Sequence, residues 1–568
     1  MNLKRLVVLL MAALTLIGSA SAASASLEPA VIRIALEQDI ETIDPQQNTA
    51  AYTCAVTEGV TEPLLREHGT EILPGLAESY ETSDYQTWIF NIRKDAQWSD
   101  GTPITARDIE WSYKEIFTRP EAAKVYILFS DVSGYKAITD AQSANATEDE
   151  LRAVVEENFG VTALDDYTLE VKLASPRPYV INTFASTAWA PIKKDLYEQY
   201  GNAYGSAADK TGYNGAYVVS EWRYNESVAL EPNPNYWNAA NIKIDRVELL
   251  IVKDQEPRVN MFREGKVDSA RASSEYLEMM ADDAFVLEGT NWNYVLVNSY
   301  RRNAEGALVN EAMSTLLANR DFVNAINAAI NRTTLFGSII TDPSYLPTNY
   351  VIPSIINSNN VARDTVGKLR GDTYADLVPI TRDEAKAKEY LAKALETLGY
   401  ASVDQLPKIT IVCASTTDPQ TVGEYMKNAL EQTLGLKIDV EPVEFNVRDS
   451  RIISGDYDLL YMGWGVSNND ADGYLSVWSD DLFCTGWPQS DPETYGKYAD
   501  LITFIGTTAD MDARANAILE AEQILLSQGP IITLATHGDA ILLSKRFDGF
   551  GIKGTNSLYD YNYASPKN

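Results

Sequence analysis

Residues 74–113 read PGLAESYETSDYQTWIFNIRKDAQWSDGTPITARDIEWSY. The aromatic and β-branched residues at 87–92 predict a strand. Asp100-Gly101 predicts a tight turn, because glycine adopts positive φ freely and an aspartate bonds its own backbone. Thr105 is followed by an acidic residue within one turn, which predicts the N-cap of a helix. None of these residues is arranged as a nucleophile, a base or a metal ligand.

The N-terminus has the features of a cleaved export signal. Lys4 and Arg5 precede an apolar run over residues 6–17, and small residues follow at 20–25. The run is too short to span a bilayer comfortably, and no cysteine follows it for lipid attachment. We therefore expect a signal peptide over residues 1–25 and an extracytoplasmic protein, either in a Gram-negative periplasm or freely secreted.

The balance of charge limits the partners. The chain of 568 residues has a formal net charge of −33, which becomes −35 (−33 − 2) without Lys4 and Arg5. Such a surface repels nucleic acid and anionic lipid and favours a soluble monomer. Roughly 540 residues exceed one hydrophobic core, so about two to four domains are expected.

Cysteine and histidine are scarce. The three cysteines (Cys54, Cys413 and Cys484) have no CxxC spacing, and the only histidines are His68 and His537. The sequence contains no GxSxG, HExxH or phosphate-binding loop motif. We therefore expect no cofactor and no metal, and a secreted hydrolase is disfavoured.

Two stretches partly match ligand motifs. GFGIKG at 549–554 fits the dinucleotide fingerprint, but too little chain follows for the required helix and strand. NNDADG at 468–473 resembles the start of a calcium loop, but the twelfth position is Ser479 instead of a bidentate Glu. The second stretch follows a strand, where α/β sheets bind ligands.

The rest of the chain divides into regions of different character. Residues 71–189 read as a compact α+β unit, and residues 212–252 are rich in strands. Residues 408–443 form a β-α-β pattern, which needs parallel strands, and residues 457–464 predict another buried strand. This order predicts two α/β lobes with an extra α+β insert.

Several phrases together resemble the extracytoplasmic solute-binding proteins of peptide-type ABC transporters, the oligopeptide/dipeptide/nickel-binding family (family 5), and most of all its oligopeptide-binding proteins. Besides residues 74–113, these phrases are TIDPQ (42–46), YNGAYVVSEW (213–222), LEPNPNYWNA (230–239), FREGKVD (262–268), NRDFVNAINAAINR (319–332) and GDYDLLYMGW (455–464). They occur in the family's order and cover nearly the whole mature chain.

The resemblance implies an α/β periplasmic-binding-protein fold with two lobes, an extra domain and a hinged cleft. Domain I would comprise residues 26–70, 190–288 and 530–568, domain II residues 71–189, and domain III residues 289–529. The implied function is the non-catalytic capture of an oligopeptide and its delivery to the permease subunits of an ABC importer. Another solute remains an alternative: an oligosaccharide, a modified peptide or a metal chelate.

The resemblance also implies which residues line the cleft. One wall would be the loop from Thr49 to Cys54, and the other would be Trp464, Gly465 and Val466. The implied substrate-binding residues are Ala51, Tyr52, Cys54, Tyr126, Arg451, Trp464, Gly465, Val466, Ser467 and Asp470.

The sequence departs from well-known peptide binders at three places. Ser467 stands where they carry an Asp that binds the α-amino group of the peptide, with Asp470 and Asp472 three and five residues later. Tyr461 replaces an Arg that can meet a peptide carboxylate. Thr290 and Gly465 stand near the two positions of a family disulfide, which is therefore expected to be missing.

Overall fold

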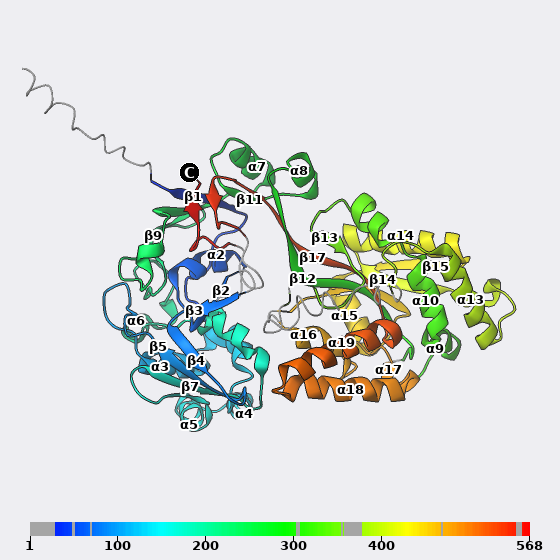
Figure 1. The fold of residues 1–568 in the computed structure, drawn as a ribbon, viewed down its shortest axis with the longest axis horizontal. Coiled ribbons are helices and arrows are strands. Elements are labelled where there is room, and N and C mark those ends of the chain that lie inside the picture. The colour runs from blue at the N-terminus through cyan, green and yellow to red at the C-terminus, as the bar shows by residue number, and fades with distance from the viewer. Residues whose placement is uncertain are drawn as a thin grey trace, which may run out of the picture.

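We analysed a computed structural model, which describes residues 29–47, 51–68, 71–302, 307–353, 356, 378–466, 470–551 and 559–567. The expected signal peptide at 1–25 lies outside the described residues. Figure 1 shows two lobes that are joined at the top by a pair of long strands. The predicted α/β fold with two lobes and an extra domain is confirmed.

In the described residues, a sheet of 11 strands runs through both lobes in the order β15-β14-β16-β12-β17-β11-β1-β10-β9-β8, with β13 also paired to β17. The strands of the first lobe are β1 (Val31–Leu36), β8 (Tyr217–Arg223), β9 (Ser227–Pro232), β10 (Arg246–Ile251) and β11 (Ser269–Arg271). Those of the second lobe are β13 (Tyr345–Pro347), β14 (Ile409–Ala414), β15 (Ile438–Val443) and β16 (Leu459–Trp464).

Two long strands, β12 (Ala284–Val297) and β17 (Ile531–Leu543), connect the lobes. They pair with each other in antiparallel fashion, and their register shifts between Leu287 and Asn291. At this shift a Cβ added to Gly289 would lie 2.4 Å from the Cα of Gly538, so a side chain at Gly289 would force the two backbones apart. The lobes are therefore joined where the ladder between the two strands is interrupted.

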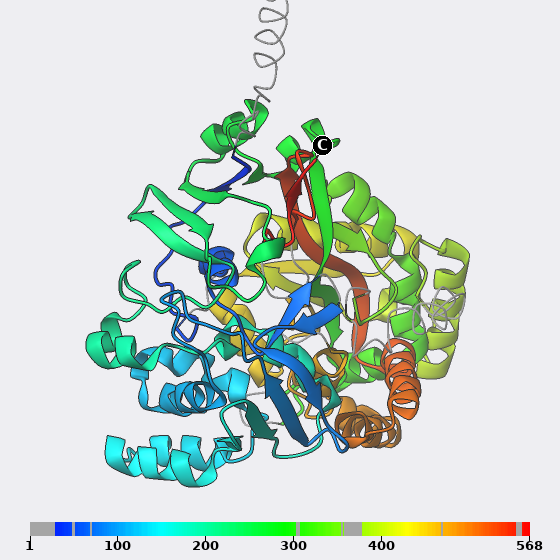
Figure 2. The same ribbon diagram turned by 60° about the vertical axis from the view of Figure 1, so that its left-hand side comes forward.

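A separate four-stranded sheet, β4-β5-β7-β6, forms the core of the region predicted as an α+β unit. Its strands are β4 (Ala77–Glu81), β5 (Thr87–Ile92), β6 (Val161–Ala163) and β7 (Thr168–Lys172), and α3 (Ala106–Glu115), α4 (Tyr135–Ser143) and α5 (Glu148–Asn158) accompany them. The predicted cap is confirmed, since Thr105 and Asp108 form a capping box on α3. In Figure 2 this sheet and its cyan helices lie below the strands that join the lobes.

The Trp98-Ser99-Asp100-Gly101 turn fastens this region to the rest of its lobe. Gly101 has φ +84°, and the Asp100 carboxylate accepts hydrogen bonds from Thr102 and forms an ion pair with Lys193. The Ser99 backbone adds one bond in each direction: its N–H donates to the Tyr213 carbonyl, and its carbonyl accepts from the Asn235 amide. The turn thus contacts residues that lie 93 to 136 positions away in the sequence.

In the second lobe, helices cover both faces of the sheet. One face packs against α10 (Arg320–Ala329), α13 (Glu384–Leu398) and α14 (Thr417–Leu434), and the other against α18 (Pro492–Thr507) and α19 (Met511–Gln528). The predicted β-α-β unit is confirmed, because β14 pairs in parallel with β15 through the crossover α14.

Shorter elements complete the fold. They are α2 (Ala51–Val60), β2 (Leu65–His68), β3 (Glu71–Pro74), α6 (Lys194–Tyr200), α7 (Gln255–Arg263), α8 (Ser274–Met279), α9 (Glu311–Ala318), α11 (Arg332–Thr334), α15 (Phe445–Ser454), α16 (Asp472–Leu475), α17 (Trp487–Ser490), β18 (Phe547–Asp548) and β19 (Ser565–Pro566). Within the described ranges, none of the helices has the length and apolar character that a membrane span requires.

Candidate functional site

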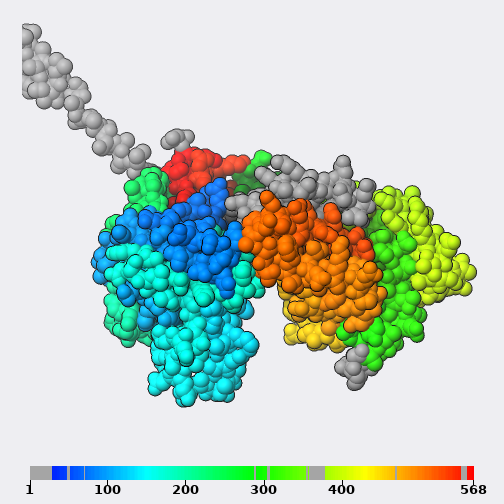
Figure 3. All heavy atoms as spheres, turned by 60° about the horizontal axis from the view of Figure 1, so that its bottom comes forward, coloured from blue at the N-terminus to red at the C-terminus, as the bar shows by residue number. Residues whose placement is uncertain are grey.

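The space between the lobes is the candidate site. The space-filling view of Figure 3 shows the cyan and orange parts of the two lobes standing apart along one side of the molecule. Strands β14, β15 and β16 are parallel, so their carboxyl ends meet at one edge of the sheet, which is where open α/β sheets bind ligands. In Figure 1, α2 and α16 lie on opposite sides of the central opening.

Trp464 is the last residue of β16 and is half-buried. Its indole N–H donates to the Gly473 carbonyl at 2.9 Å, and its ring meets the Phe483 ring edge-on at 5.5 Å. Gly465 is exposed and Val466 is partly buried, while Ser467 lies outside the described residues. The Trp464 ring is thus fixed on one side by the protein and keeps part of its surface accessible.

Asp470 is not available to a ligand, which corrects the expectation that its carboxylate could bind an incoming ammonium. Both of its oxygens accept from the Arg514 guanidinium, at 2.8 and 3.0 Å, and the two side chains are 0% and 1% exposed. One oxygen also accepts from the Asp472 backbone N–H at 2.8 Å. These three bonds use most of the acceptor sites of the Asp470 carboxylate, and separating the pair would leave the buried Arg514 charge without its counter-ion.

Asp472, two residues later, is the accessible carboxylate of this loop. It is half-buried at the start of α16, and no ion pair joins it to another residue in the described part of the chain. Burial and the neighbouring Asp470 raise the pKa of its carboxyl to about 6, although Arg514 and Arg177 act in the opposite direction. Arg177 belongs to the first lobe, so Asp472 lies within electrostatic range of both lobes.

The residues predicted on the opposite wall belong to α2. The Tyr52 hydroxyl donates to Glu37 at 2.6 Å, and burial raises the pKa of Tyr52. Cys54 is partly buried, and Ala51 begins the helix. Their contact with a solute stays a prediction.

Tyr126 and Arg451 are already engaged within the protein. The Tyr126 hydroxyl donates to the Arg119 carbonyl at 2.8 Å. Arg451 forms two bonds to Glu441, at 2.6 and 2.7 Å, from the last turn of α15. Glu441 would therefore compete with a ligand carboxylate for the Arg451 guanidinium.

The structure shows the surroundings of Tyr461 and of the three cysteines, which bear on the departures from well-known peptide binders. Tyr461 is buried in the core, and its hydroxyl donates to Asn293 at 3.3 Å, so it does not replace a ligand-binding Arg in function. Cys54, Cys413 and Cys484 are all free thiols. Burial raises the pKa of the Cys413 thiol to about 11.

Sequence reasoning missed a polar cavity beside the strands that join the lobes. It has a volume of about 290 Å³ and is lined by Arg271, Thr290, Asn291, His537 and Asp539, among others. Arg271 forms an ion pair with Asp539, and His537 stacks on Tyr345 with the ring centroids 4.1 Å apart. Burial lowers the pKa of His537, so its imidazole is neutral at pH 7. In the sequence, only the scarcity of histidine drew attention to His537.

The described residues contain no group of three or more His, Cys, Asp or Glu side chains that could hold a metal ion. The charged groups described at the site are the carboxylate of Asp472 and the ion pair between Arg271 and Asp539. Such a set suits the reversible binding of a solute.

Comparison with known proteins places this geometry in a family. The family model described as bacterial extracellular solute-binding proteins, family 5, matches residues 71–482. The periplasmic oligopeptide-binding protein OppA of Escherichia coli is 28% identical over 454 residues, which cover 77% of this chain and 75% of that protein.

Solved structures show the same fold. The unliganded open form of the periplasmic murein tripeptide binding protein MppA has a TM-score of 0.78 at 20% identity, covering 95% of this chain and 98% of that chain. Listeria monocytogenes OppA bound to peptide has a TM-score of 0.61 at 21% identity, covering 95% and 100%. Since the family model spans well over half of the sequence, the chain belongs to family 5 of the bacterial extracellular solute-binding proteins.

Proposed function

We propose that this protein captures peptides outside the cytoplasm and delivers them to the membrane permease of an ABC importer, without catalysing a reaction on them. The peptide class is supported by the related proteins, which include oligopeptide- and dipeptide-binding proteins of several bacteria. The basic residues Lys4 and Arg5, the apolar run at 6–17 and the small residues at 20–25 support export through a cleaved signal.

The domain division from the sequence fits this function. One hydrophobic core lies almost wholly within residues 71–189, with Leu64 and Leu65 added to it, and two further cores lie on the two faces of the second lobe. Domain I would carry β1 and β8–β11, and domain III would carry the parallel strands β14, β15 and β16. A peptide held between them would favour a closed arrangement only to the extent that it binds that arrangement better.

The observation that assigns peptide binding to a particular residue is the carboxylate of Asp472, which no ion pair occupies in the described part of the chain. A peptide brings a free α-amino group, which needs a carboxylate when it is removed from water. Asp470 cannot serve, because Arg514 already occupies it. Asp472 is the next acid on the same loop and has no ion-pair partner among the described residues. We therefore assign the α-amino group of the peptide to Asp472.

Calorimetry with tetra-alanine and its N-acetylated form tests both parts of this proposal. The unmodified protein should bind the free peptide more tightly than the acetylated one. The Asp472→Asn variant should lose about two decades of affinity for the free peptide and little for the acetylated one, since a desolvated charge that loses its partner costs about 3 kcal/mol. Binding of neither peptide by the unmodified protein, with binding of an oligosaccharide instead, would refute the peptide class.

A further inference from the structure

A second contact joins the lobes, far from the strands β12 and β17. Arg177 of the first lobe donates from Nη1 to the Gly506 carbonyl at 2.9 Å. Gly506 lies in the last turn of α18, where unpaired carbonyls give the helix end a partial negative charge that favours a cation. A second guanidinium bond, from Nε to Asp131 at 3.2 Å, fixes Arg177 to its own lobe.

A cavity lined from both lobes accompanies this hydrogen bond. Tyr80, Tyr85, Trp88 and Ile181 of the first lobe line a cavity of about 410 Å³, and Met511 at the start of α19 lines the same cavity from the second lobe. A methionine side chain has three rotatable bonds and a polarizable sulfur, so it can keep contact with aromatic rings over a range of orientations.

Hydrogen bonds connect the helix turn that contacts Arg177 to the loop that carries Asp472. The carbonyl of Ile505, next to Gly506, accepts from Arg514 Nε at 2.9 Å. The same Arg514 holds Asp470, and Asp470 accepts from the Asp472 backbone. Movement of the α18 end relative to the first lobe is therefore coupled to the position of the loop that carries Asp472.

The place of this contact in the molecule determines what it can do. In Figure 1, the teal segment near residue 180 meets the orange α18 at the bottom of the molecule, while β12 and β17 join the lobes at the top. Figure 3 shows the lobes touching along one side and standing apart along the other. Two attachments define a line, and a rotation of one lobe about this line closes the open side while both attachments persist.

Both parts of the contact tolerate such a rotation. A carbonyl oxygen accepts hydrogen bonds over a broad range of directions. Gly506 has no side chain, and a Cβ there would lie 3.2 Å from Arg177 Nη1, so a larger residue would push against the guanidinium. We propose that the bond between Arg177 and Gly506, together with the seat of Met511, is a swivel joint that fixes the axis on which the lobes close.

The joint should matter for binding because it restricts the free protein. Without it, only β12 and β17 would hold the lobes, which would then sample more relative orientations. Each additional orientation adds conformational entropy that a solute must remove when it binds. This inference rests on the arrangement of the lobes and does not depend on which solute the protein takes.

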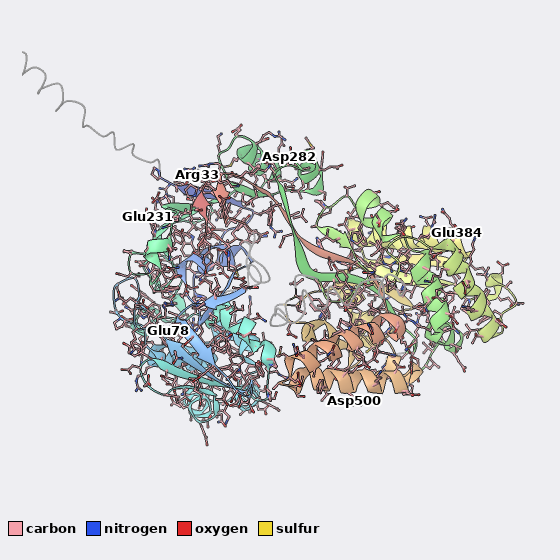
Figure 4. All side chains as sticks on the ribbon, viewed as in Figure 1. Arg33, Glu78, Glu231, Asp282, Glu384 and Asp500 are labelled. Carbon is pink, nitrogen blue, oxygen red and sulfur yellow. The ribbon has the colours of Figure 1, made fainter. Side chains whose placement is uncertain are left out.

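Spin-label distance measurements on the ligand-free protein test the joint. Labels at Glu231→Cys and Glu384→Cys would report on the two lobes, since both residues are exposed and lie on opposite sides of the molecule (Figure 4). The native thiols at Cys54, Cys413 and Cys484 would first be replaced. Arg177→Ala should broaden the distance distribution around a similar mean.

Two further variants make the test specific. Gly506→Val, which crowds the same guanidinium, should broaden the distance distribution as Arg177→Ala does. The distribution of the double variant should be little broader than that of either single variant. Arg107→Ala removes an exposed ion pair with Asp166 on the same lobe and should change nothing. An unchanged distribution in folded Arg177→Ala would overturn the proposal. A shift of the whole distribution to shorter distances without broadening would also overturn it, because the contact would then be a latch that holds the lobes apart.

Discussion

Replacing Asp472 by Asn should stabilise the protein at neutral pH while it weakens peptide binding. Burial and the charge of Asp470 raise the pKa of Asp472 from 3.8 to about 6. The folded protein therefore binds a proton at Asp472 more readily than the unfolded chain does. The stability contributed by protonated Asp472 is fully present below about pH 4 and is lost as the pH rises through about 6.

The magnitude follows from the shift. One pKa unit corresponds to about 1.4 kcal/mol, so a shift of roughly two units sets an upper limit of about 3 kcal/mol. Asn has no charge to bury, so Asp472→Asn should raise the free energy of unfolding by about 1–3 kcal/mol at pH 7 and by much less at pH 4.

Urea unfolding of the ligand-free protein and of Asp472→Asn at pH 4, 5, 6 and 7 measures this difference. The free energies of the two proteins should diverge with rising pH, with most of the change between pH 4 and 6. Parallel curves over this range would refute the reasoning, because they would show that Asp472 is solvated like an ordinary surface carboxylate. A gain in stability combined with a loss of affinity would show that the charge is retained for binding.

Four other variants test neighbouring parts of the account. Asp470→Asn removes the carboxylate that neutralises the buried Arg514 guanidinium, so urea unfolding should show a loss of about 3–5 kcal/mol. Burial raises the pKa of Asp100, but hydrogen bonds from Lys193 and Thr102 lower it further, to about 2. The stability from these bonds is present above about pH 4 and is lost as the pH falls toward 2. The melting temperature of Asp100→Asn should therefore fall less steeply between pH 4 and 2 than that of the unmodified protein. Gly289→Ala should lower the melting temperature, because the added methyl group meets backbone atoms of β17 at 2.4 Å. Trp464→Ala should weaken peptide binding in calorimetry more than it lowers the melting temperature, since part of the ring is accessible; the reverse order would assign the ring to the core.

The parts of the fold that depend on neighbouring residues could be predicted from the sequence. The strand at 87–92, the cap at Thr105 and the β-α-β unit follow from local spacing and turn chemistry, and all are present. The partners of the Trp-Ser-Asp-Gly turn could not be predicted, because Lys193 and Asn235 are brought to it only by the folded chain.

The candidate site illustrates the same limit. Asp470 and Asp472 look equivalent in the sequence, since both are acids in a polar loop after a buried strand. What separates them is Arg514, which is 44 residues from Asp470 in sequence and neutralises it in the interior. No local pattern reports such a pairing. The contact between Arg177 and Gly506, which are 329 residues apart, could not be predicted from the sequence for the same reason.

The identity of the bound solute tests the central claim most directly. Protein purified under native conditions from cells grown in peptide-rich medium would be denatured, and the released small molecules would be analysed by mass spectrometry. The account predicts short peptides with free N-termini, at up to one per protein molecule, and their depletion in Asp472→Asn. Release of a saccharide or a metal chelate in place of peptides, in amounts unaffected by Asp472→Asn, would contradict it.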